Sequence, residues 1–253
     1  MRIGSVEFEK IDSIAIITLD EPAKLNALSA GIRQGVTEGL AMIDRDEEIR
    51  VGIITGRGDK AFCAGADIGG FPETAQEARN FIATMLPFLA SPERCRKPLV
   101  AAVNGLAFGG GFELAIACDF VIASERAKFA VPEIQLGLLP GFALVRLHDI
   151  VGRPKAKELS MLGEPLDATE AARLGIALRV TAHDRLLDEA MAFARKLAAK
   201  PPMALEMAKS FYNRGLGGDE MRYAVDSFPI LFLTDDVKEG VAAFREKRKP
   251  EFK

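Results

Sequence analysis

Residues 97–119 read KPLVAAVNGLAFGGGFELAIACD, and the rest of the chain is organised around them. Residues 98–103 form a short apolar run without alternating polar side chains, which predicts a strand buried on both faces. Asn104-Gly105 is a turn signal. Three consecutive glycines at 109–111 then lead into residues 112–118, an apolar run with a helical pattern. The stretch therefore predicts a buried strand, a turn and a helix.

The triple glycine and Glu113 point to chemistry in this stretch. Glycines leave no side chain in the way, so the free backbone N–H groups of a helix start can meet a ligand oxygen. Glu113 lies among apolar neighbours in the first helical turn, where an unpaired carboxylate is costly. Alone, that carboxylate is explained equally well by the helix dipole and by catalysis. The glycines favour catalysis, because a helix start needs no triple glycine for stability.

Length and composition bound the kind of protein. The 253 residues, 49% of them apolar, allow one large domain with a sizeable core, or a domain with a small appendage. A net charge of −3 gives no electrostatic footprint for nucleic acid. No apolar run is long enough to span a membrane, and residues 1–8 lack a signal-peptide core. We therefore expect a cytoplasmic protein without a nucleic-acid or membrane partner.

Cysteines and histidines exclude several kinds of site. Cys63, Cys95 and Cys118 are widely spaced and form no C-x-x-C pair, so neither a disulfide framework nor a zinc site is predicted. With only His148 and His183, a Ser-His-Asp triad or a histidine-rich metal site is hard to build. The nucleotide-binding and hydrolase strings G-x-G-x-x-G, P-loop and G-x-S-x-G do not occur. We expect no metal.

The N-terminal third predicts a hairpin followed by a helix. Residues 6–11 and 14–19 have strand patterns joined by a turn at Asp12-Ser13. A helix is predicted from an N-cap at Ser29 to about residue 44. Glycines recur along it every fourth residue, at positions 31, 35 and 39. They predict close approach of another backbone, which we favour over a dimerisation stripe.

The remaining pattern predicts a βαβ sheet that becomes helical. Further strands are expected at 51–55, 120–123 and 128–131, with a helix over 73–90 interrupted near Pro87. From residue 142 the chain is nearly all helical, with one strand-like segment at 177–181 and an amphipathic helix over 235–253.

Two loops that follow strands, 56–68 and 132–141, lie where α/β folds place their sites. In the second loop Glu133 has apolar neighbours, and taken alone it is best explained as a solvated loop carboxylate.

Several of these segments, in this order, resemble the crotonase family, which is the enoyl-CoA hydratase/isomerase superfamily. Each match is weak by itself, but the joint order and spacing are specific and extend over nearly the whole chain. The matching segments are 22–28, 62–68, 102–105 with 109–113, 132–134 with Gly137, Pro140-Gly141, and 239–252.

The resemblance implies a fold and an assembly. The fold is α/β, with a spiral core of repeated ββα units and a helical C-terminal region used for trimer contacts. It implies that residues 1–181 form the acyl-CoA-binding, catalytic core and that residues 182–253 form the helical region. A homotrimer or a dimer of trimers is expected.

The resemblance also implies roles. Ala66 and Gly110 would offer backbone N–H groups to the thioester oxygen, and Glu113 and Glu133 occupy both acid/base positions of the hydratases. An acyl-CoA thioester is the implied substrate, so coenzyme A is part of the substrate and no separate cofactor is expected. Further substrate-binding positions are Lys24, Leu25, Ala64, Asp67, Ile68, Gly109 and Gly141.

The chemistry of hydration agrees with these roles. Adding water to a 2-enoyl thioester builds negative charge on the carbonyl oxygen, which two fixed N–H donors stabilise. One carboxyl must deprotonate water and the other must protonate Cα; we assign these tasks to Glu113 and Glu133, with the reverse division open. An enoyl-CoA delta-isomerase needs only one carboxylate. A non-catalytic acyl-CoA-binding subunit would lack a glutamate or have a blocked oxyanion loop. The sequence therefore favours an enoyl-CoA hydratase.

One segment departs from the family pattern. After Pro140-Gly141 many hydratases resemble Gly-Ala-Gly-Gly-Thr-Gln-Arg-Leu, whereas residues 142–147 read FALVRL here. Bulky side chains, including Phe142 and Leu144, replace small ones beside the expected acyl pocket. We therefore expect a reshaped pocket that prefers short or unusual acyl groups.

Overall fold

The computed structural model describes residues 1–67 and 74–213, together with six residues of the tail: Asp235, Glu239, Ala243, Glu246, Arg248 and Glu251. Ile68 and most of the predicted helix over 235–253 lie outside the described residues.

A seven-stranded sheet forms the centre of the molecule, in the order β1-β2-β3-β4-β6-β8-β11. β2 and β3 form the predicted antiparallel hairpin, and the strands from β3 to β11 run parallel. The bounds are β1 (Arg2–Ile3), β2 (Val6–Ile11), β3 (Ile14–Leu19), β4 (Val51–Gly56), β6 (Leu99–Val103), β8 (Phe120–Ser124) and β11 (Arg179–Thr181).

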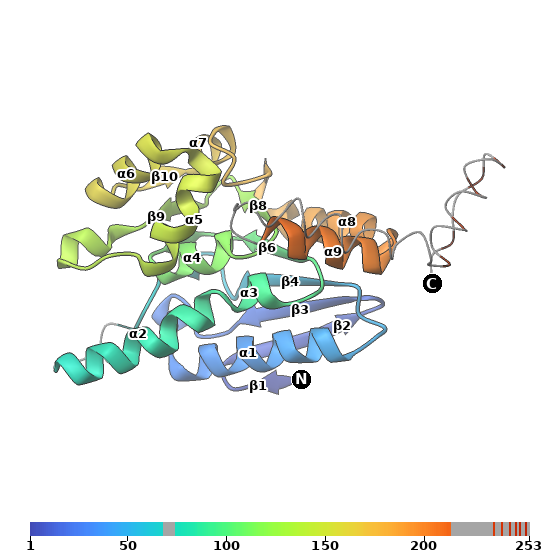
Figure 1. Cartoon of the computed structure of the whole chain (residues 1–253), viewed down its shortest axis with the longest axis horizontal. Helices are drawn as coiled ribbons and strands as arrows, with labels where there is room; N and C mark the ends of the chain where they lie inside the picture. The colour runs from blue at the N-terminus through green and yellow to red at the C-terminus, as the bar shows by residue number, and fades with distance from the viewer. Residues whose placement is uncertain are drawn as a thin grey trace.

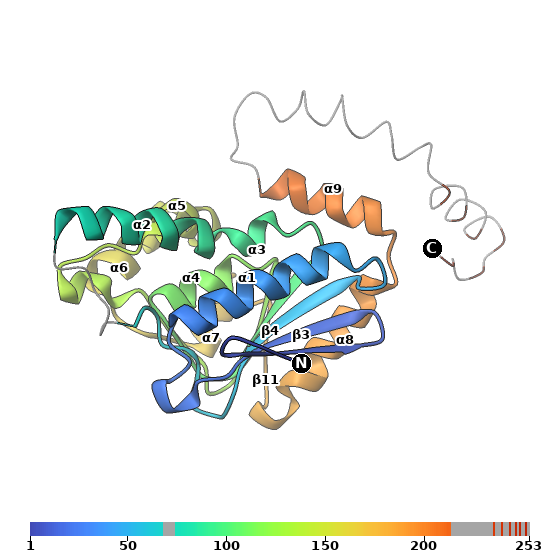
Figure 2. The same ribbon diagram turned by 90° about the horizontal axis from the view of Figure 1, so that it is seen from below.

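Helices cover both faces of this sheet. α1 (Ala30–Arg45) and α8 (Leu186–Ala198) lie on opposite sides of β3 and β4 (Figure 2). Every residue of β6 is buried, as its continuous apolar run predicts. Two hydrophobic clusters result: one includes the α1 face of the sheet, and the other joins alternate strand residues to the apolar side of α8.

A second sheet of four short strands, ordered β10-β9-β7-β5, lies beside the first. β5 (Ala61–Cys63), β7 (Leu106–Phe108) and β9 (Lys128–Ala130) are parallel, and β10 (Leu166–Asp167) pairs antiparallel with β9. Strands β4, β6 and β8 of the large sheet are each followed by one of these short strands. This repeated pairing, followed by helical segments, is the predicted spiral of ββα units.

The glycine face of α1 lies directly on the first strands. Ser29 caps the helix by accepting a hydrogen bond from the Ile32 N–H at 3.2 Å. A Cβ atom at Gly35 would overlap the Ile3 carbonyl and the Val6 side chain. The predicted close approach of a neighbouring backbone is therefore confirmed.

α2 (Ala75–Leu89) contradicts one prediction. Its N-terminus has a capping box formed by Thr74 and Glu77. Pro87 lies inside the helix and does not interrupt it. Only the backbone hydrogen bond that an N–H at position 87 would donate is lost, and the helix ends within the next turn. α3 (Ser91–Arg94) follows.

From residue 142 to residue 213 the chain is mainly helical, as predicted. Figure 1 shows α5, α6 and α7 grouped with β9 and β10 on one side of the molecule, where η3 also packs against α6. The bounds are η1 (Pro22–Lys24), α4 (Gly110–Ile116), η3 (Pro132–Leu136), α5 (Gly141–Val151), α6 (Arg153–Leu162), α7 (Ala168–Arg173), η4 (His183–Arg185) and α9 (Pro202–Tyr212). The domain boundary after residue 181 stays a prediction.

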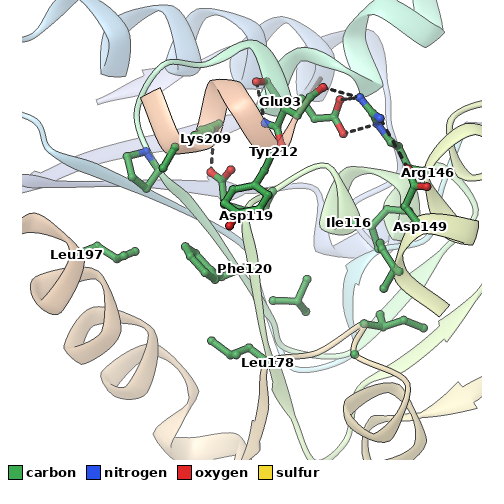
Figure 3. Close-up of a pocket in the computed structure, with 18 of the residues that line it drawn as sticks. Glu93, Ile116, Asp119, Phe120, Arg146, Asp149, Leu178, Leu197, Lys209 and Tyr212 are labelled. Carbon is green, nitrogen blue, oxygen red and sulfur yellow. Dashed lines mark hydrogen bonds and ion pairs between the residues drawn. The ribbon is translucent and has the colours of Figure 1, made fainter. Parts of the chain in front are cut away.

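A buried lysine attaches α9 to the core. The Lys209 Nζ donates hydrogen bonds to Asp119 Oδ2 at 2.7 Å, to the Pro92 carbonyl at 2.9 Å and to the Lys97 carbonyl at 3.0 Å. Figure 3 shows Lys209 and Asp119 pointing toward each other at the edge of a cavity of about 500 Å³. Neither Glu113 nor Glu133 lines this cavity, so it is separate from the candidate site.

We expect Lys209→Met to lower the free energy of unfolding by about 3–5 kcal/mol, because it leaves a buried carboxylate without its cation. Burial already raises the pKa of Asp119. Urea denaturation measures the change. The double variant Lys209→Met/Asp119→Asn should recover part of the lost stability, because its buried side chain is neutral. Arg185→Met, which removes an exposed ion pair with Asp188, is the control and should change stability by less than about 1 kcal/mol. A Lys209→Met loss as small as that control would contradict this account.

Candidate active site

Glu113 and Glu133 come together at the start of α4, although they are 20 residues apart in the chain. Glu113 lies in the first turn of α4 and is 3% exposed. Glu133 comes from η3 and is partly buried. A Cβ atom on Gly109, the residue before α4, would lie 2.7 Å from Glu133 Oε1. The two carboxyl groups therefore flank the same helix start.

The Glu113 carboxyl is held in place by the next helix. Its Oε1 accepts a hydrogen bond from the Ala143 N–H, in the first turn of α5, at 2.8 Å. The pKa of Glu113 is raised to about 7: burial is the largest cause, the Ala143 N–H opposes it, and the nearby Glu133 charge adds to it. Glu113 therefore titrates near neutral pH in a fixed orientation.

The Glu133 carboxyl has a different environment. Its Oε2 is buried and has no hydrogen-bond partner among the described residues. Burial raises the pKa of Glu133 as well. A buried carboxyl oxygen without a partner is costly when charged. The arrangement therefore favours a neutral Glu133, or one that meets a ligand.

Two backbone N–H groups lie side by side near these carboxyls. Gly110 is the first residue of α4, and neither its N–H nor that of Ala66 has a hydrogen-bond acceptor in the described part of the chain. A Cβ on Gly110 would lie 3.8 Å from the Ala66 N. Gly109 caps the helix with φ +52°, a backbone conformation that favours glycine. Two such free donors can accommodate one negatively charged oxygen.

Four of the predicted substrate-binding residues, Lys24, Leu25, Ala64 and Asp67, lie close together in the chain segments on either side of Leu28 and Gly65. The Ala64 N–H donates to the Leu25 carbonyl at 3.0 Å, and the Leu28 N–H donates to the Gly65 carbonyl at 2.8 Å. The Lys24 Nζ is 3.5 Å from Asp67 Oδ2. Gly109 lies beside Glu133, whereas Gly141 begins α5 and packs against Leu86. Ile68 lies outside the described residues.

The two bulky residues after Gly141 point to different places. Phe142 is buried and lines a groove of about 460 Å³ together with Leu86, Pro87 and Val145. Leu144 is 45% exposed and does not line this groove. The effect of Phe142 on the acyl pocket stays a prediction.

Other classes of site find no support in the described ranges. No group of three or more His, Cys, Asp or Glu side chains there could hold a metal ion. Within those same ranges, no helix is long and apolar enough to cross a membrane. The three cysteines are buried, and burial raises the pKa of Cys63 to about 12. Cys63 is therefore a poor nucleophile.

Glu113→Gln should make the protein more stable at pH 8 than the unchanged chain. Because the pKa of Glu113 is higher in the folded state, the folded protein binds more protons than the unfolded one between pH 4.5 and about 7. The stabilisation by protonated Glu113 is present below pH 4.5 and is lost as pH rises through about 7. At pH 8 the free energy of unfolding of Glu113→Gln should therefore exceed that of the unchanged chain by about 3 kcal/mol. Urea denaturation at pH 5 and pH 8 measures it. A gain that is equal at both pH values would contradict the buried titration.

Known proteins resemble this chain over its full length. Residues 9–253 match the sequence profile of the family described as enoyl-CoA hydratase/isomerase. The chain is 43% identical over 244 residues to a probable enoyl-CoA hydratase of Rhizobium meliloti, covering 95% of this chain and 94% of that protein. It is 38% identical over 257 residues to a crotonyl-CoA hydratase of Syntrophomonas wolfei, covering 100% and 99%. The crystal structure of an enoyl-CoA hydratase from Bacillus anthracis superposes with a TM-score of 0.92 at 32% identity, covering 98% of this chain and 99% of that one.

Proposed function

The chain belongs to the enoyl-CoA hydratase/isomerase family and is an enoyl-CoA hydratase, and we propose that Glu113, Glu133, Ala66 and Gly110 carry out the reaction. The observation that supports these roles is that the buried Glu113 carboxyl, the partly buried Glu133 carboxyl and two N–H groups without an acceptor among the described residues lie together at the start of α4. Hydration requires one base, one acid and an oxyanion site.

The proposed reaction proceeds through an enolate. The Glu113 carboxylate takes a proton from water as the water oxygen forms a bond to C3 of the 2-enoyl thioester. The electron pair of the double bond moves through Cα to the carbonyl oxygen, where the Ala66 and Gly110 N–H groups stabilise the charge. Glu133 then gives its proton to Cα. One proton is taken from water and one is given to Cα, so water has been added and the proton of the pair now lies on Glu113. That proton must return to Glu133 through solvent before the next turnover.

The hydrogen bonds of the two carboxyls support this division of roles. The Ala143 N–H stabilises the charged form of Glu113, so Glu113 is suited to be the base. Glu133 Oε2 receives no donor from the described residues and is better neutral, as an acid must be. Because each role needs one protonation state, kcat/KM should fall at both low and high pH.

We propose a short-chain 2-enoyl-CoA as the substrate. The Syntrophomonas wolfei relative is named a crotonyl-CoA hydratase, and here the bulky, buried Phe142 directly precedes Ala143, whose N–H binds the Glu113 carboxyl. A panel of enoyl-CoA thioesters of different length and branching tests this proposal. Loss of the absorbance of the conjugated double bond reports water addition. Absence of hydration across the whole panel would overturn the proposed function.

We also propose that the protein acts in the cytoplasm as a homotrimer or a dimer of trimers, with coenzyme A entering as part of the substrate. Exposed apolar side chains on the described C-terminal helices, such as Leu187 and Met203, support assembly through residues 182–253. A trimer is also expected to bury some of the apolar residues Leu231, Phe232, Leu233 and Phe244 of the same region, which lie outside the described residues.

Light scattering at micromolar concentration should give three or six times the chain mass of 27.4 kDa. The expectation follows from the apolar surface that the C-terminal helices would otherwise leave in water. A clean species of 27.4 kDa under the same conditions would contradict the proposed assembly.

A further inference from the structure

We propose that Asn26 and Asn104 are positioning residues: their side-chain amides fix β5 against β7 and thereby align the Ala66 and Gly110 N–H groups. The inference rests on the proposed function, because it concerns the two donors of the oxyanion site. Neither asparagine lies at the helix start where the two glutamates meet. Both side chains are buried, with exposed fractions of 0% for Asn26 and 6% for Asn104.

Asn104 ties the start of β7 to the chain that leads into β5. Its Nδ2 donates to the Gly58 carbonyl at 2.7 Å and to the Ala61 carbonyl at 3.2 Å. Its Oδ1 accepts from the Gly56 N–H at 3.2 Å. Asn104 stands two residues before β7, and Ala61 is the first residue of β5. One amide therefore joins the beginnings of the two strands.

Asn26 reaches the same carbonyl from a different segment. Its Nδ2 donates to the Ala61 carbonyl at 2.9 Å and to the Arg57 carbonyl at 3.0 Å, and its Oδ1 accepts from the Glu21 N–H at 3.0 Å. A carbonyl oxygen has two lone pairs, so Ala61 can accept both amides. The beginning of β5 is thus fixed by the two asparagines together.

The strands that need this support are very short. β5 and β7 have three residues each, and their register shifts between Ala61 and Cys63. A ladder of three residues with an irregular register has few hydrogen bonds to resist a slip. A slip of one residue moves a strand by about 3.3 Å, more than a hydrogen bond tolerates. The amides supply the constraint that the ladder lacks.

The other ends of the same two strands lead to the oxyanion donors. β5 ends at Cys63, three residues before Ala66, and β7 ends at Phe108, two residues before Gly110. The two runs also touch at this end, because a Cβ on Gly111 would overlap the Cys63 carbonyl. If β5 moves relative to β7 where the two asparagines hold them, the other ends of the strands move as well. The Ala66 and Gly110 N–H groups can then no longer donate to the same oxygen.

The test uses Asn26→Gly and Asn104→Ala. Glycine suits position 26 because Asn26 has φ +54°, where a larger residue would be strained. Butyryl-CoA labelled with ¹³C at the thioester carbonyl binds without reacting, and infrared difference spectra report how strongly the donors polarise that carbonyl. We expect a clear downshift of the carbonyl frequency in the unchanged protein and less than half of it in each variant. We also expect a loss of tenfold or more in kcat with crotonyl-CoA.

Thr55→Val is the matched control. Its hydroxyl donates to the Ala102 carbonyl at 2.8 Å, between β4 and β6, so the variant removes a hydrogen bond next to the loop without loosening β5. Its carbonyl downshift should equal that of the unchanged protein. Asn104→Ser, a smaller polar change, replaces Asn104→Ala if the latter does not fold. An unchanged downshift in the folded Asn26 and Asn104 variants would overturn this inference alone. Absence of a downshift in the unchanged protein would overturn the oxyanion pair as well.

Discussion

Glu113→Gln and Glu133→Gln should each lower kcat by about 10²- to 10⁴-fold, which is roughly 3–5 kcal/mol in the barrier, with KM little changed. Glutamine keeps the volume of each side chain, and at position 113 its amide oxygen can still accept from the Ala143 N–H. What is lost is the ability to take or give a proton. Initial rates with crotonyl-CoA measure the effect.

The double variant should lose less than the product of the two single losses, because the two carboxyls work on one water and share one proton. Glu164→Gln, at an exposed glutamate, is the control and should retain full activity. An isomerase would behave asymmetrically, with one substitution severe and the other silent. A pure binder would show no hydration in the unchanged protein. Full hydratase activity in either folded single variant would exclude the two-carboxylate mechanism.

The long elements of the fold could be predicted from sequence because their patterns repeat. The hairpin of β2 and β3 and the capped helix α1 have the predicted bounds to within a residue or two. The sequence does not predict β5, β7 and β10, because two or three residues are too few to show a period. These short strands are nevertheless what distinguishes the spiral from an ordinary βαβ sheet.

The parts of the site that are made by unusual side chains can be predicted from the sequence, whereas backbone groups and contacts between distant segments cannot. Glu113 and the glycines before it signal chemistry by themselves, since a carboxyl and three glycines are unusual at an apolar helix start. The sequence around Glu133, taken alone, predicts a solvated loop carboxylate, and this prediction is wrong because Glu133 Oε2 is buried. Only the fold brings η3 beside α4. The Ala143 N–H gives no sequence signal, because every residue except proline has that group.

Gly110→Pro should abolish most turnover while the protein still folds. Proline is well suited to the first position of a helix, and Gly110 is the first residue of α4. Proline has no N–H, so one of the two proposed oxyanion donors disappears. Losing one such donor costs about 10²- to 10³-fold in kcat. Steady-state kinetics with crotonyl-CoA and circular dichroism of the same preparation measure activity and folding together.

Gly110→Ala separates the lost donor from simple crowding. Alanine keeps the N–H and adds a Cβ that would lie 2.7 Å from Leu28 Cδ1, the flexible end of a side chain that can move aside. We therefore expect Gly110→Ala to lose less than about tenfold in kcat, well short of the donor effect. Equal losses in the two variants would assign the effect to the space beside Leu28 and not to the N–H. Normal kcat in a folded Gly110→Pro protein would remove Gly110 from the oxyanion site, and the charge on the thioester oxygen would then need a different second donor beside Ala66.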